Sequence, residues 1–157
     1  MPVEIEHKFH VLSDDWRTKC VGSVRIVDGL VAATAGRKVR VRIAGEQGYV
    51  TLKGARNGTA RDEFEYPIPR EDADSLLASH CDNMIVVKTR YFVLEDGFTF
   101  EVDVYEGLLD GVVLAEAELS WPGQIFPRPS WLGEEVTGRV EYKKANMLRA
   151  KLALQTT

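Results

Sequence analysis

The sequence predicts a mainly β, α+β protein whose strands form an antiparallel sheet or barrel. Most of the chain consists of short segments in which apolar and polar residues alternate, the periodicity of strands. Turn-forming residues separate these segments, as at positions 45–48 and 95–97. Only three stretches carry helical signals. No fixed-period repeat or low-complexity linker interrupts the chain, and we therefore expect a single domain over residues 1–157.

Eight segments show the alternation that is typical of strands. In the first of them, charged residues at positions 4, 6 and 8 alternate with Ile5, His7 and Phe9. The eight expected strands are Glu4–Val11, a stretch within Ser23–Ala33, Lys38–Ile43, Gly48–Lys53, Arg61–Ile68, Met84–Leu94, Thr99–Tyr105 and Val112–Ser120.

The expected helices are few and peripheral to this pattern. Ser13 precedes two aspartates, a helix start with an N-cap and acids in the first turn. Glu71–Cys81 carries an apolar stripe at helical spacing, and Tyr142–Leu154 suggests a terminal helix. The charged residues at 141–144 are expected to form a solvated start of that helix. Between these helices, Pro127, Pro129 and Gly133 predict a loop or short turn.

Composition excludes several classes of protein. The 157 residues are 45% apolar and 28% charged, as in an ordinary soluble globular protein. A net charge of −4 argues against a nucleic-acid partner, and no apolar run approaches the roughly 20 residues that span a bilayer. Cys20 and Cys81 lie far apart without metal-ligand spacing, which favours reduced thiols. We expect a cytoplasmic protein with no membrane partner.

The charges on the expected strands are arranged in pairs of one sign. Side chains two residues apart share a face of a strand, where like charges repel and do not help folding. A single such strand would ordinarily be the solvated face of a sheet. Here this unfavourable pairing of like charges recurs on six strands, which indicates a functional site. The pairs are Glu4 and Glu6, Arg40 and Arg42, Glu63 and Glu65, Lys88 and Arg90, Glu101 and Asp103, and Glu116 and Glu118.

These charges favour metal and phosphate chemistry. With Lys8 and Lys53 added, eight acids and six bases would give one closed cavity a charge of −2. Carboxylates about 4 Å apart repel by about 4 kcal/mol at an effective dielectric constant of 20. Hard divalent cations with oxygen ligands relieve that repulsion, above all Mg²⁺ or Mn²⁺. The bases call for a polyanionic ligand, and arginine pairs suit phosphate oxygens.

The same residues resemble the CYTH superfamily, the triphosphate tunnel metalloenzymes. Its hallmark E-x-E-x-K matches Glu4-Ile-Glu6-His-Lys8, and the later motifs follow in family order as far as about residue 138. They are the R-x-R pair at 40 and 42, Thr51-Leu-Lys53, the E-x-E pair at 63 and 65, the K-x-R pair at 88 and 90, and the acids at 101, 103, 116 and 118. The resemblance implies an eight-stranded antiparallel β-barrel tunnel with a charged interior and a few outer helices.

The resemblance also implies an activity. It is the divalent-metal-dependent hydrolysis of a terminal phosphoryl group from a triphosphate, with inorganic triphosphate as the leading substrate, and two Mg²⁺ or Mn²⁺ ions in the site. Lys88, Glu6 and Glu118 would be catalytic, whereas Glu101 would be structural. The expected substrate-binding residues are Lys8, Arg40, Arg42, Lys53 and Arg90. The expected metal ligands come from Glu4, Glu6, Glu63, Glu65, Asp103, Glu116 and Glu118.

Two positions depart from the family pattern. Leu30 stands where compact bacterial relatives carry a tyrosine, and His7, expected to point outward, stands where they frequently carry arginine. Three alternatives stay open: a thiamine triphosphatase, a class IV adenylate cyclase and a non-catalytic polyphosphate- or nucleotide-binding module. Monomer and homodimer are both compatible with the sequence.

Overall fold

The computed structural model describes residues 2–155 of the chain. Its strands are β1 (Val3–Val11), β2 (Cys20–Thr34), β3 (Arg37–Ala44), β4 (Gln47–Lys53), β5 (Ala60–Ile68), β6 (Ile85–Glu95), β7 (Phe98–Glu106), β8 (Val113–Glu118) and β9 (Leu132–Glu135). The helices are α1 (Arg70–Ser79) and α2 (Lys144–Gln155), with short 3₁₀ turns η1 (Asp15–Lys19), η2 (Gly107–Leu109) and η3 (Val140–Tyr142). All eight expected strands are confirmed.

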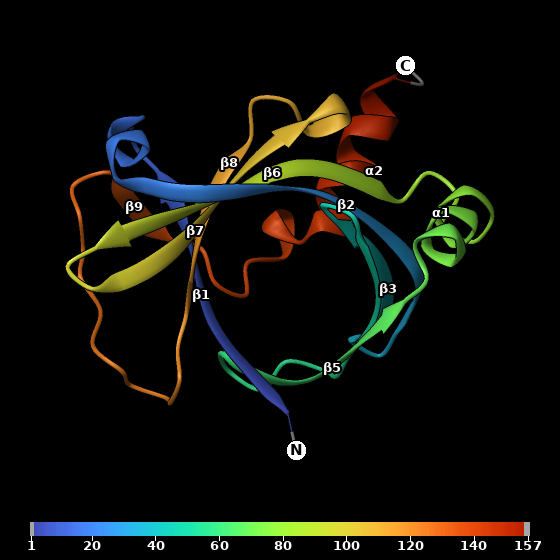
Figure 1. Cartoon of the computed structure of the whole chain (residues 1–157), viewed down its shortest axis with the longest axis horizontal. Helices are drawn as coiled ribbons and strands as arrows, with labels where there is room; N and C mark the ends of the chain where they lie inside the picture. Colours follow the sequence, from blue (N-terminus) through green and yellow to red (C-terminus); the bar gives the residue numbers. More distant parts are fainter. Residues whose placement is uncertain (1, 156–157) are drawn as a thin grey trace.

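Eight of the strands close into an antiparallel barrel (Figure 1). Neighbours are hydrogen-bonded in the order β5-β4-β3-β2-β6-β7-β8-β1, and β1 closes the ring by pairing with β5 through Val3–Ile5. The remainder of β1 pairs with β8, so that Glu6 lies opposite Glu118. The predicted barrel is therefore confirmed, and its closure brings charges from both ends of the chain together.

Helix α1 covers the outside of β3 and β4. The outward residues Val41 and Ile43 pack against Ala73, Leu77 and Cys81. Two glycines of the barrel wall permit this approach. A Cβ at residue 29 would lie 2.5 Å from the Cys81 sulfur, and one at residue 48 would lie 2.8 Å from the Ala73 Cβ. The outer apolar residues of the alternation thus form a core against the helix, which leaves the charged residues on the inner face.

Helix α2 takes a different position from the outer one that was expected. Its buried Leu148 belongs to a cluster with Val86, Tyr105 and Leu114, which lie on the inner strand faces because they are two residues from Lys88, Asp103 and Glu116. Leu148 also lines the interior cavity. The terminal helix therefore closes part of the barrel interior and brings its first residues to the charged centre.

Strand β9 was missed, because the sequence predicted only a loop or turn there. It forms through tertiary pairing with β1, with Leu132 opposite Val11 and Glu135 opposite Phe9. Gly133 permits the contact, since a Cβ there would lie 3.0 Å from the His10 carbonyl oxygen. The segment expected to become helical after Ser13 forms the 3₁₀ turn η1. No helix among residues 2–155 is long and apolar enough to cross a membrane.

Candidate active site: a charged tunnel

The barrel encloses a cavity of about 360 Å³ that is lined by the inward-facing strand residues and by the segment leading into α2. Twelve of the fourteen charged residues singled out from the alternation line it. They are Glu4, Glu6, Lys8, Arg40, Arg42, Lys53, Glu63, Glu65, Arg90, Glu101, Glu116 and Glu118. Residues far apart in the sequence thus form one continuous polar surface.

Lys88 and Asp103 are the two exceptions, because they lie within the barrel wall. Their side chains are 0% and 1% exposed, and Lys88 Nζ lies 2.7 Å from Asp103 Oδ2. Burial opposes ionisation of Asp103, but the charges of Lys88 and Arg90 outweigh it and lower the pKa of this carboxyl. The pair therefore lies behind the cavity surface, with the carboxylate form of Asp103 favoured by its basic partners.

Arg90 connects that buried pair to the cavity. Its Nε and one terminal nitrogen donate to the two oxygens of Asp103 at 2.8 and 3.0 Å. The other terminal nitrogen reaches Glu101 at 2.8 Å, and the one that contacts Asp103 also reaches Glu116 at 3.4 Å. Burial opposes ionisation of Glu116, yet Arg90 and Lys8 hold its pKa well below the usual range. The bidentate contact to Asp103 fixes the plane of the Arg90 guanidinium.

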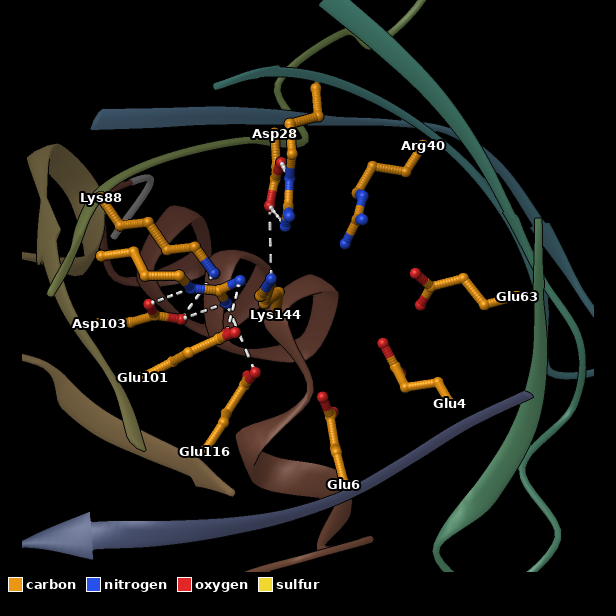
Figure 2. A network of polar contacts seen from close by, with 12 residues as sticks. Glu4, Glu6, Asp28, Arg40, Glu63, Lys88, Glu101, Asp103, Glu116 and Lys144 are labelled. Carbon is orange, nitrogen blue, oxygen red and sulfur yellow. Dashed lines mark hydrogen bonds and ion pairs between the residues drawn. The ribbon is translucent and has the colours of Figure 1, made fainter. Parts of the chain in front are cut away.

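A second ion network holds Arg42 in place. Two of its members, Asp28 and Lys144, were not predicted from the sequence. Arg42 donates to both oxygens of Asp28 at 2.6 and 2.9 Å, and Lys144 donates to the same carboxylate at 3.4 Å. The expectation that residues 141–144 form a solvated helix start is wrong, because α2 begins at the cavity and directs Lys144 inward (Figure 2). Asp28 was not predicted because the residues two positions away on its strand, Ile26 and Leu30, are uncharged, so that it belongs to no like-charge pair.

The carboxylates around β1 are less well compensated. Burial raises the pKa of Glu6, and the nearby charges of Glu116 and Glu4 raise it further. Burial and the charges of Glu4 and Glu6 likewise raise the pKa of Glu118. Glu4 lies 3.2 Å from Lys53, yet burial still raises its pKa. These acids lie on the adjacent strands β1 and β8, and their basic partners compensate only part of their mutual repulsion.

The chemistry of this acidic group fits a divalent metal ion. Buried carboxylates whose ionisation is hindered by one another are stabilised by a hard cation with oxygen ligands. In the described part of the chain, however, no three acidic, histidine or cysteine side chains already converge on a point that could hold a metal. Glu4 contacts Lys53 and Glu6 contacts Arg56, at 3.2 and 3.5 Å. Metal binding would therefore require these carboxylates to turn from their basic partners.

The cavity is more basic than predicted. Eleven basic and eight acidic side chains line it, a formal charge of +3 in place of the expected −2. The basic residues that were missed are Lys38, Arg56, Arg61, Arg139, Lys143 and Lys144. Lys38 and Arg61 continue the alternation of the pairs at 40 and 42 and at 63 and 65, so this signal was present in the sequence. The others come from loops and the start of α2, where periodicity predicts nothing.

His7 points away from the cavity, as predicted, and takes part in a network that positions Lys8. His7 Nδ1 lies 2.7 Å from a Glu135 oxygen, which also accepts a hydrogen bond from the Thr137 hydroxyl at 2.7 Å. That hydroxyl accepts a hydrogen bond from the Lys8 backbone N–H at 2.9 Å, and Val136 N–H donates to the Lys8 carbonyl. The segment after β9 thereby fixes the backbone of β1 next to the cavity.

Comparisons with known proteins agree with this geometry. Residues 3–150 match the CYTH domain family. An inorganic triphosphatase of Acetivibrio thermocellus is 38% identical over 149 residues, which cover 95% of each chain. One of Nitrosomonas europaea is 36% identical over 73% of this chain and 76% of its own. The crystal structure of an inorganic triphosphatase superposes with a TM-score of 0.65 at 32% identity, covering 94% of this chain and 95% of that one.

Proposed function

Because this chain belongs to the CYTH domain family, we propose that it is a metal-dependent hydrolase that removes a terminal phosphoryl group from inorganic triphosphate. The observation that carries the proposal is the cavity of about 360 Å³, whose formal charge is +3 and whose cations come from five strands, the loops and the start of α2. A linear polyanion is the ligand that such a surface complements best. The relatives that share most of the chain are inorganic triphosphatases, which supports that choice of substrate.

The basic side chains would hold the phosphoryl groups. Lys8, Arg40, Arg42, Lys53 and Arg90 all line the cavity, and Lys144 joins them from α2. Arg42 and Arg90 are each oriented by a bidentate carboxylate, so a substrate would meet cations that are already in position. Fixed charges of this kind stabilise the negative charge that spreads over the phosphoryl oxygens in the transition state.

The acidic side chains would hold the metal. We assign Mg²⁺ or Mn²⁺, two ions per site, to ligands drawn from the carboxylates around the cavity. Bound there, such ions neutralise the triphosphate and lower the pKa of the attacking water. The candidate ligands on the cavity surface are Glu4, Glu6, Glu63, Glu65, Glu116 and Glu118. Asp103, also a candidate, is committed to Lys88 and Arg90 and would have to release them first.

Two residues are assigned to the chemical step and a third to positioning. Glu6 and Glu118 lie opposite each other on β1 and β8, and their raised pKa values suit carboxylates that take up a proton from the attacking water. Lys88 does not reach the cavity surface, so we assign it a positioning role. It neutralises Asp103, which in turn orients Arg90 toward the substrate.

Thiamine triphosphate is the second candidate substrate, because one flank of the cavity is apolar. Leu30, Met84, Val86 and Leu148 line it beside the charged residues. Leu30 removes the hydroxyl that the family pattern places there and leaves a surface that could accommodate an organic group. A nucleotide cyclase and a non-catalytic binding module are the remaining alternatives.

Phosphate release from inorganic triphosphate, thiamine triphosphate and ATP tests the proposal, with each substrate assayed in Mg²⁺, Mn²⁺ and EDTA. We expect the highest kcat/KM for inorganic triphosphate and no release in EDTA. Higher kcat/KM for thiamine triphosphate would transfer the assignment to the second candidate. Cyclic AMP formation from ATP would identify a cyclase, and tight triphosphate binding without turnover would identify a binding module.

A further inference from the structure

Three basic residues at one edge of the barrel are not accounted for by the triphosphate clamp. Lys38 lies near the start of β3, Arg61 near the start of β5, and Lys143 immediately before α2. Lys53, opposite Lys38 in the sheet, is the last residue of β4. Because adjacent antiparallel strands begin and end at the same edge, the strand positions lie together at one end of the cavity, and Lys143, whose charge acts on Lys38, lies near them. We refer to Lys38, Arg61 and Lys143 as the basic rim.

Lys38 is the residue of the rim whose charge is least compensated. Besides its own burial, the four charges that act on it most strongly are Arg61, Lys143, Lys53 and Lys8, and all of them are positive. Among residues 2–155, no carboxylate forms an ion pair with Lys38 or Lys143, and Arg61 reaches Glu4 only at 3.6 Å. Concentrated positive charge of this kind, facing a cavity, is a feature that an anion would stabilise.

The charge at the two ends of a triphosphate determines what such a rim can recognise. A free terminal phosphoryl group carries close to two negative charges above pH 7, because its second pKa is about 6. A phosphoryl group esterified to an alcohol has lost that second ionisation and carries one charge. A cluster of uncompensated cations therefore attracts a free phosphoryl end more strongly than an esterified one.

We propose that the basic rim binds the free phosphoryl end that is not hydrolysed, and so selects inorganic triphosphate over triphosphates esterified to an organic group. This inference rests on the proposed function and adds the residues that confer its specificity. It assigns the choice of substrate to charge at the rim, whereas the clamp deeper in the cavity binds features that all triphosphates share. The apolar flank at Leu30 would then not suffice to make an organic triphosphate the better ligand.

The test compares the dissociation constants of inorganic triphosphate and ATP, measured by calorimetry in EDTA for the wild-type chain and the K38Q/K143Q variant. In the variant we expect the dissociation constant of inorganic triphosphate to rise roughly tenfold and that of ATP at most about threefold, because the lost charges act on a dianion in one case and a monoanion in the other. Equal losses for the two ligands would overturn the proposal.

Matched variants separate this effect from general loss of charge. Arg37→Gln removes a cation one residue from Lys38, on the outward face of β3 where the side chain is exposed. It should leave the ratio of the two dissociation constants unchanged. A shift in that ratio as large as in K38Q/K143Q would contradict the role of the rim. Because binding is measured without metal or turnover, absence of triphosphatase activity would defeat the proposed function while this test still decides the specificity.

The ionisation of Lys38 provides an independent readout. Burial and the surrounding cations lower its pKa from 10.5 to about 8, so Lys38 loses its charge at a lower pH than an ordinary lysine. The preference for inorganic triphosphate over ATP should accordingly weaken between pH 7 and pH 9. In Lys38→Arg, whose guanidinium stays protonated throughout this range, the preference should persist at pH 9. A pH dependence that is the same in both proteins would count against Lys38.

Discussion

The carboxylates of the tunnel fall into two regions with opposite electrostatic character. In the wall formed by β6, β7 and the end of β8, Lys88 and Arg90 hold the pKa values of Asp103 and Glu116 below their usual range. Around β1, by contrast, burial and mutual repulsion raise the pKa values of the acids, among them Glu6 and Glu118. Apart from Glu101, the acids of the first region are compensated by basic partners within the fold, whereas those of the second are not.

The difference indicates a division of roles. Saturated ion pairs fix geometry, because removing either partner leaves a buried charge uncompensated. Carboxylates that repel one another contribute no such rigidity, but they acquire affinity for a cation or a proton. We therefore interpret the β6–β7 wall as the frame that positions Arg90, and the acids around β1 as the part of the site that changes state during the reaction.

The largest expected effect concerns activity in the uncompensated region. Glu118→Gln removes a carboxylate that the proposal assigns to the metal and the attacking water, and kcat should fall by about a hundredfold or more. The free energy of unfolding should not decrease, because the substitution relieves repulsion with Glu4 and Glu6. Steady-state kinetics and urea denaturation measure the two quantities. Glu71→Gln, on the exposed face of α1, is the matched control. Unchanged kcat in Glu118→Gln would remove this residue from the site.

For a substitution in the wall, the main expected effect is a decrease in the free energy of unfolding. Asp103→Asn leaves Lys88 fully buried without a counter-charge and should lower the free energy of unfolding by about 3 kcal/mol. Urea denaturation measures the loss. The double variant Lys88→Met/Asp103→Leu removes both charges together and should recover most of that stability. If Asp103→Asn were as stable as the wild type, the ion pairs of the wall could not be the frame that positions Arg90.

A pH dependence of stability follows from Glu101, the wall residue that resembles the β1 acids. Arg90 is shared among several carboxylates, and burial raises the pKa of Glu101 from 4.5 to about 7. The folded state therefore binds this proton more tightly than the unfolded state, and stability falls as the pH rises from about 4.5 to 7. Glu101→Gln should reduce the loss of stability between pH 5 and pH 8 by about 2 kcal/mol. Identical pH profiles of unfolding would show that Glu101 ionises normally.

The smallest effect on the free energy of unfolding is expected from a substitution at the start of α2. Lys144→Ala breaks the 3.4 Å contact with Asp28, but the side chain is 24% exposed and Arg42 still neutralises the carboxylate. The loss of stability should stay below about 1 kcal/mol. KM for inorganic triphosphate should rise, because a clamp cation is lost. Lys151→Ala, exposed on the same helix, should change neither quantity. If Lys144→Ala lost more stability than Asp103→Asn, the interpretation of the β6–β7 wall as the frame of the site would be contradicted.

Much of the fold was predictable because a strand alternates with a strict period of two. This period is visible wherever both faces have a consistent character, as in the like-charge pairs at 40 and 42 and at 63 and 65. It identified the eight barrel strands and twelve residues of the cavity wall. Strand β9 was not predictable in this way, because its pairing with β1 depends on tertiary contact and its sequence contains Gly133.

The missed part of the site has a related explanation. Arg56, Arg139 and Lys143 lie outside the barrel strands, and only closure of the barrel and docking of α2 bring them to the cavity. Periodicity also does not predict whether a side chain on the inner face reaches the cavity or is buried beneath its surface. Lys88 and Asp103 alternate in the same way as the cavity residues, although the structure places them beneath the surface. The predicted charge of −2 was wrong because basic residues of the cavity were missed, whereas the loss of Lys88 and Asp103 from the cavity surface leaves the net charge unchanged.

The most direct test of the central claim follows inorganic triphosphate by ³¹P NMR in the presence of Mg²⁺, with the wild-type chain and Glu118→Gln at equal concentration. We expect the wild type to convert each triphosphate into one orthophosphate and one pyrophosphate, and the variant to leave the substrate intact over the same period. A stable triphosphate spectrum with the wild type, or equal conversion by both proteins, would contradict it.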